Sequence, residues 1–296
     1  MLILARNNPR PARLGIFATA LAGLLMLAAG LVAGKHARAE DIRIGGSGSG
    51  LATMQLLSEA FHASQSEHRI VIEPVLGTSG GIRAVAAGNI QLAVASRALT
   101  DTERSLGVIQ IEYGRSPFVF ATHAGNKATA LTTQEVANLY SGKMDKWPDG
   151  TRARMILRPA GDSDTPVIRS ISPAVNQANT EALSRSGMLL AVTDHDSIAT
   201  IEKVPGAVGT TMLSMIIAMK LPLKALTLNG VAPSAKTIAN GSYPHFKHMY
   251  FVTGPKTAAA ARRFIAFVQS PAGQKILKRT EHWVVDEGGR ARDAPR

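Results

Sequence analysis

Short apolar runs alternate with amphipathic stretches along most of the chain, and this alternation restricts the possible folds more than any other feature. Residues 41–46, 69–76 and 91–95 have the composition of strands, whereas residues 51–64 place apolar side chains at helical spacing. Strands that alternate with helices pair through crossover connections, which favour parallel neighbours. The pattern therefore predicts an α/β protein with mainly parallel sheets, and no Gly/Ser/Pro-rich linker or internal repeat divides it.

The alternation continues toward the C-terminus. Thr132 and Glu135 have the spacing of a capping box, and Ser270 followed by Pro271 marks the start of a last helix. The aromatic content is only 5%, which argues against a stacking platform for single-stranded nucleic acid, so we expect no nucleic-acid partner. Further strands are expected at residues 108–113, 117–122, 154–157, 207–210, 223–228 and 250–253, and further helices at 80–87, 132–140, 213–220 and 256–269.

The N-terminal segment has the three parts of a secretory signal peptide. Arg6, Arg10 and Arg13 precede an apolar run at residues 14–34, and Ala37-Arg38-Ala39 has the small-residue pattern of a cleavage site. We expect residues 1–39 to be removed on export, with a retained membrane anchor as the alternative. The net charge of +12 falls to +7 without this segment, because residues 1–39 contain five basic residues and no acidic one. The predicted location is the periplasm.

The sequence contains no cysteine. In an exported protein this excludes disulfides, thiolate metal sites, cysteine nucleophiles and a lipid-modified cysteine anchor. Together with the predicted signal peptide, the absence of cysteine leads us to expect a soluble protein of the cell envelope.

Three loops rich in Gly, Ser and Thr each stand where a predicted strand ends and a helix begins. They are residues 46–50 (GSGSG), 77–81 (GTSGG) and 158–165 (RPAGDSDT). Such loops present backbone N–H groups and hydroxyls at the positive end of a helix dipole, which suits an anion. Because open α/β sheets bind ligands at the carboxyl ends of their strands, the three loops together predict one anion site.

Catalytic alternatives fit these residues less well. The dinucleotide fingerprint Gly-x-Gly-x-x-Gly fails because Leu51 stands at its sixth position, and the hydrolase elbow Gly-x-Ser-x-Gly fails because Gly48 is at the centre. Residues 194–196 (DHD), His245 and His248 are expected to be solvated rather than metal ligands. With no nucleophile–base pair and no metal-ligand cluster, we expect no enzyme, no metal and no cofactor.

The chain resembles the phosphate-binding periplasmic subunits of ABC transporters, within the type II periplasmic binding protein superfamily. The resemblance covers the whole mature chain and is specific as an ensemble. Its carriers are the loops at 46–50 and 77–81, residues 94–99 (VASRAL) with Glu103, residues 139–143 (LYSGK) with Trp147, Arg158 with Ser163 and Thr165, residues 205–209 (PGAVG), Pro233-Ser234, Tyr243-Pro244, and Phe264 with Ser270 and Gly273-Gln274.

The resemblance implies two α/β lobes, each with a mainly parallel central sheet, joined by two crossing strands with the ligand in the cleft between them. The crossings would fall near residues 116–122 and 243–250. Lobe one is then 40–117 plus 245–296, and lobe two is 118–244.

The resemblance also implies the ligand-binding residues. Two departures stand out: Arg97 occupies the position where phosphate-selective members place an Asp that accepts the ligand's proton, and Asp164 replaces a Gly. We expect Arg97 and Asp164 to pair across the closed cleft, with Asp164 as a relocated proton acceptor as the alternative. Arg158 is the expected main charged donor, unless it only braces its loop by pairing with Asp162 or Asp164. The implied set is Ser49, Gly50, Leu51, Thr78, Ser79, Gly80, Ser96, Arg97, Arg158, Ser163, Asp164 and Thr165.

The implied function is capture of a small oxyanion, phosphate above others, by a monomer that hands it to the membrane subunits of an ABC transporter. The alternatives are an envelope sensor or scaffold of the same fold and, less favoured, an exported phosphate-handling hydrolase.

Overall fold

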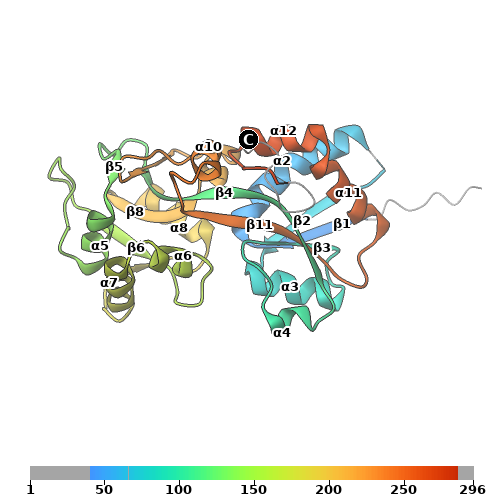
Figure 1. Ribbon diagram of the computed structural model, residues 1–296, viewed down its shortest axis with the longest axis horizontal. Coiled ribbons are helices and arrows are strands. Elements are labelled where there is room, and N and C mark those ends of the chain that lie inside the picture. The colour runs from blue at the N-terminus through green and yellow to red at the C-terminus, as the bar shows by residue number, and fades with distance from the viewer. Residues whose placement is uncertain (1–40, 66, 286–296) are drawn as a thin grey trace, which may run out of the picture. The chain divides into compact units, whose positions relative to one another are not determined.

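The computed structural model describes residues 41–65 and 67–285, so the predicted signal peptide at 1–39 lies outside the described residues. Nine strands of this part form one sheet in the order β2-β1-β3-β11-β4-β8-β6-β7, with β9 also paired to β4 (Figure 1). They are β1 (Ile42–Gly46), β2 (Ile70–Val75), β3 (Leu92–Ala95), β4 (Ile109–His123), β6 (Arg154–Leu157), β7 (Leu189–Leu190), β8 (Ala207–Met212), β9 (Leu223–Ala225) and β11 (Phe246–Thr253). The strands β5 (Ala130–Leu131) and β10 (Thr227–Leu228) pair separately.

The predicted α/β class is confirmed, because helices connect parallel strands at both ends of the sheet. β1 pairs in parallel with β2 and β3, and β6 pairs in parallel with β7 and β8. The helices are α2 (Gly48–Ser64), α3 (Gly77–Ala87), α4 (Asp101–Arg104), α5 (Thr133–Ser141), α6 (Asp164–Ser170), α7 (Pro173–Leu183), α8 (Asp194–Lys203), α9 (Leu213–Ala218), α10 (Ala235–Ala239), α11 (Ala259–Gln269) and α12 (Pro271–Arg279).

Strands β4 and β11 connect the two parallel parts of the sheet. β11 pairs antiparallel with β3 and with the first half of β4, whereas the second half of β4 pairs antiparallel with β8 and β9. The sequence predicts two extended segments at 108–113 and 117–122, but the structure makes them one strand. Pro117, which has no N–H to donate, lies where β4 changes from one set of partners to the other.

The buried apolar residues form separate clusters on either side of this connection. One cluster draws its buried members from residues 118–243, and two others draw theirs from residues 42–113 and 249–284. The division into two lobes, with the bounds given above, stays a prediction. None of the helices within residues 41–285 is long and apolar enough to cross a membrane.

The local signals for helix starts are confirmed. Thr132 caps α5 by accepting from the Glu135 N–H, and the Glu135 carboxylate accepts from the Thr132 N–H. Ser270 caps α12, which has Pro271 in its first turn. The predicted strand at 223–228 is instead divided into β9 and β10, because residues 223–225 pair with β4 whereas residues 227–228 pair with β5.

Candidate functional site

Each of the three predicted loops lies at the carboxyl end of a parallel strand and leads into a helix. β1 leads to α2, β2 leads to α3, and β6 leads to α6. No side chain caps the N-terminus of α2 or α3, whereas Thr132 caps α5 and Thr193 caps α8. The first N–H groups of an uncapped helix need partners from elsewhere, and an anion is a suitable one.

Two glycines allow the first two loops to approach closely. Gly46 has φ +122°, and a side chain there would collide with the backbone of Val94. A Cβ on Gly81 would lie 2.6 Å from the Gly46 Cα, so α3 packs directly against the end of β1. Glycine at both positions brings the N-terminus of α3 to the N-terminus of α2.

Four hydroxyls from separate segments meet at this point. Ser47 Oγ donates to Ser96 Oγ at 3.0 Å, and Thr78 Oγ1 lies 3.2 Å from the same atom. Ser96 Oγ is also 3.2 Å from Ser163 Oγ, which belongs to the third loop. The predicted residues Thr78, Ser96 and Ser163 are therefore brought together, and Ser47 joins them.

Arg158 is buried with 1% of its surface exposed, at the end of β6. Its Nε and Nη2 donate to the Asp162 carboxylate at 3.2 and 3.0 Å. Arg158 therefore stabilises its own loop through Asp162, as the alternative role predicted. Its Nη1 has no hydrogen-bond partner among residues 41–65 and 67–285. Burial works to lower the pKa of Arg158, but the charges of Asp164, Asp194 and Asp162 raise it. The guanidinium is thus a permanent buried cation, and Arg158 lines the cavity described below.

Lys247 lies beside the candidate site and is absent from the residues that the sequence predicts. It lies on β11, is 2% exposed, and donates to Ser163 Oγ at 2.9 Å and to the Asp164 carboxylate. Thr210 Oγ1 donates to the other Asp164 oxygen at 2.8 Å. Burial would raise the pKa of Asp164, but Lys247 and Arg158 hold it below its ordinary value. Asp164 is therefore an ionised partner of two cations.

The expected ion pair between Arg97 and Asp164 is wrong. The Arg97 guanidinium donates to both Glu103 oxygens at 2.7 and 2.8 Å and to Ser79 Oγ at 2.7 Å. The hydrogen bond from Arg97 and those from Thr100 hold the pKa of Glu103 at about 2 despite its partial burial. Glu103 is a local partner only six residues away, and Asp164 is already neutralised by Lys247.

The expectation that Asp194 is solvated is also wrong. It is the first residue of α8, 6% exposed, and its Oδ2 accepts from Ser49 Oγ at 3.0 Å. Its Oδ1 has no hydrogen-bond partner and lies 3.9 Å from Arg158 Nη2. Burial, reinforced by the charge of Asp164, raises the pKa of Asp194. The Thr193–Asp196 capping box, readable in the sequence, places Asp194 at a helix start like those of the other loops.

A cavity of about 330 Å³, here called the interloop cleft, opens beside these groups. Six of the predicted residues line it: Thr78, Ser79, Gly80, Arg97, Arg158 and Ser163. The structure does not place the other six among the lining residues of the cleft: Ser49, Gly50, Leu51, Ser96, Asp164 and Thr165. Gly50 N donates to Ser47 O, Leu51 packs in a core cluster and Thr165 Oγ1 donates to Pro159 O at 2.8 Å. Other lining residues are Ser47, Gly48, Val75, Leu76, Gly77, Arg83, Gly161, Asp162, Val192, Thr193 and Asp194.

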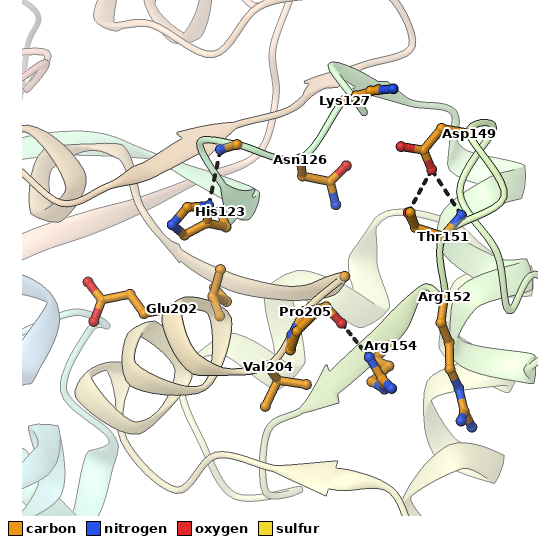
Figure 2. Close-up of a pocket in the computed structure, with 13 residues that line it drawn as sticks. His123, Asn126, Lys127, Asp149, Thr151, Arg152, Arg154, Glu202, Val204 and Pro205 are labelled. Atoms are coloured by element: carbon orange, nitrogen blue, oxygen red, sulfur yellow. Dashed lines mark hydrogen bonds between the residues drawn. The ribbon is translucent and has the colours of Figure 1, made fainter.

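A larger cavity of about 640 Å³, here called the basic hollow, contains His123, Lys127, Arg152 and Arg154 (Figure 2). His123 accepts from the Gly125 N–H, and Arg154 donates to the Pro205 carbonyl oxygen. Within residues 41–285, the buried polar atoms without partners include none from its lining, whereas Arg158 Nη1 and Asp194 Oδ1 belong to the interloop cleft. The interloop cleft is therefore the better candidate site. The described residues contain no group of three His, Cys, Asp or Glu able to hold a metal ion.

Comparison with known proteins places the sequence among binding proteins. The PBP superfamily domain matches residues 32–272. The phosphate-binding protein PstS of Bacillus subtilis is 25% identical over 165 residues, which are 53% of this chain and 49% of that protein, so the match spans about half of that relative.

The fold comparison agrees. A Clostridium perfringens protein whose crystal structure contains bound phosphate superposes with a TM-score of 0.70 and 21% identity, covering 83% of this chain and all of that one. An ABC-type phosphate transport receptor from Vibrio cholerae gives a TM-score of 0.56 and 18% identity, covering 81% of this chain and 98% of that one. At these identities the likeness establishes the fold.

Proposed function

The chain belongs to the PBP superfamily, and from this premise we propose that it is a periplasmic substrate-binding protein that captures an oxyanion of the phosphate class. The oxyanion binds in the interloop cleft and is delivered to the membrane subunits of an ABC transporter. The predicted signal peptide at residues 1–39 supports export, and the names of the relatives support the ligand class and the transporter. The protein acts as a monomer and catalyses no reaction.

One observation carries this proposal: Arg158 lines the cleft, and its buried, charged donor Nη1 has no partner within the part of the chain that the structure describes. A buried donor left unpaired is costly, and an anionic acceptor removes that cost. Micromolar affinity requires about 8 kcal/mol, and each hydrogen bond to a charged group contributes roughly 1.5–3 kcal/mol. Arg158, the cleft hydroxyls and the first N–H groups of α2 and α3 supply enough donors for such an affinity.

The charge balance of the site determines how a phosphate dianion is accepted. Arg158 and Lys247 face three carboxyl groups, those of Asp162, Asp164 and Asp194. A further anion beside three carboxylates is repelled, and burial, which raises the pKa of Asp194, favours the neutral form of this carboxyl. The neutral form lessens this repulsion, and Asp194 Oδ2 accepts from Ser49 Oγ.

Calorimetric titration of the purified protein with phosphate and with sulfate tests the proposal. We expect micromolar phosphate binding without turnover. Arg158→Lys keeps the buried charge but loses the planar fork, so phosphate affinity falls about thirtyfold, or about 2 kcal/mol. Arg154→Lys, the matched change in the basic hollow, leaves the affinity unchanged. Absence of phosphate binding at millimolar concentration, or equal affinity in Arg158→Lys, contradicts the proposal.

A further inference from the structure

The interloop cleft has more space than an inorganic oxyanion needs. Its volume of about 330 Å³ reaches the range of roughly 300–1,000 Å³ in which proteins bind small organic molecules. An oxyanion of five heavy atoms held at Arg158 fills only part of that space. The remaining volume is available to a substituent on the anion.

The lining of the cleft includes exposed apolar groups. Leu76 is 42% exposed and Val192 is 61% exposed, although large apolar side chains are usually buried. Leu76 belongs to the connection from β2 to α3, and Val192 to the connection from β7 to α8, so two separate segments each contribute one apolar residue to the same cleft. Val75 also lines it. Single exposed apolar residues are ordinary, but two that converge on one cavity indicate a ligand with an apolar part.

The lining also includes buried polar groups. Arg158, Thr78 and Asp194 are each more than nine-tenths buried, and Arg158 Nη1 and Asp194 Oδ1 have no hydrogen-bond partner. The lining therefore combines polar groups that fit an anion with apolar groups that fit carbon. Arg83 and Arg97 also line it, and Arg97 is already paired with Glu103.

From this arrangement we propose that the preferred ligand is an organic phosphate, a phosphomonoester or phosphonate with a small apolar substituent, rather than inorganic phosphate. The inference rests on the proposed function, because it places the phosphoryl oxygens at Arg158. The substituent lies between Leu76 and Val192, where its carbon atoms leave water and strengthen binding.

Calorimetry with three ligands tests this inference: inorganic phosphate, n-butyl phosphate and glycerol 3-phosphate. We expect n-butyl phosphate to bind at least tenfold more tightly than either of the others, because only its substituent gains from apolar contact. Val192→Ser should reduce the preference for n-butyl phosphate over inorganic phosphate about fivefold. Leu190→Ser is the matched control, because Leu190 is 56% exposed but does not line the cleft, and it should leave the preference unchanged.

The outcomes separate this inference from the proposed function. If inorganic phosphate binds as tightly as n-butyl phosphate, the preference for an organic ligand is overturned and the proposed function stands. If the preference survives Val192→Ser, or falls equally in Leu190→Ser, the assigned position of the substituent is overturned. If neither phosphate nor its esters bind, the proposed function fails and the inference fails with it.

Discussion

Replacing Lys247 by methionine is predicted to destabilise the protein through the buried Asp164 carboxylate. Lys247 and Asp164 are 2% and 1% exposed and form an ion pair. Removing one partner of a buried pair costs about 3–5 kcal/mol, because the remaining charge is left without compensation. Asp164 would keep Thr210 at 2.8 Å and Arg158 at 3.6 Å, so the lower end, about 3 kcal/mol, applies.

Urea unfolding and calorimetry measure this cost. For a chain of this size, 1 kcal/mol corresponds to roughly 2–4 °C in Tm, so Lys247→Met should lower Tm by about 6–12 °C. Asp164→Asn removes the orphaned charge while keeping an oxygen for Thr210. The double variant Asp164→Asn/Lys247→Met should therefore recover at least about 2 kcal/mol relative to Lys247→Met alone.

An exposed pair provides the control for this cycle. Arg104 and Asp101 lie 3.5 Å apart with both side chains more than half exposed, so Arg104→Met should not change Tm measurably. If the effects of Asp164→Asn and Lys247→Met add to within about 0.5 kcal/mol, the two residues are not coupled. The electrostatic description of the site would then be refuted.

Two further changes report on other parts of the site. Burial raises the pKa of Asp194 above that of an unfolded carboxyl, so wild-type stability falls as pH rises from the ordinary carboxyl pKa through the raised one. Asp194→Asn should therefore be more stable than wild type near pH 7, with the gain disappearing near pH 3 in urea unfolding. Gly81→Ala should lower stability by about 1–3 kcal/mol, because its Cβ would press on the Gly46 backbone. Gly161→Ala should not lower stability, because there is open space around Gly161. Equal Tm values for the two alanine variants would contradict the close packing of α3 on β1.

Local signals in the sequence predicted most of the fold. The capping boxes, the Ser-Pro start of α12 and the glycine-rich strand ends depend on residues within a few positions of one another, so they can be read without the tertiary structure. The three loops were predicted to form one site, and Thr78, Ser96 and Ser163 do meet.

The charged interior of the site could not be predicted in the same way. Lys247 pairs with Asp164 across 83 positions, and a single lysine on a strand gives no signal of a distant buried partner. Arg97 has a carboxylate six positions away, and this local pair prevails over the long-range pair that was expected. Asp194 could have been placed at a helix start from its capping box, but its burial depends on Ser49, 145 positions earlier.

A crystal structure of the protein grown with saturating phosphate tests the central claim most directly. We predict a tetrahedral anion in the interloop cleft, with an oxygen within about 2.7–3.2 Å of Arg158 Nη1. An empty interloop cleft, or an anion bound only among His123, Lys127, Arg152 and Arg154 of the basic hollow, would contradict it.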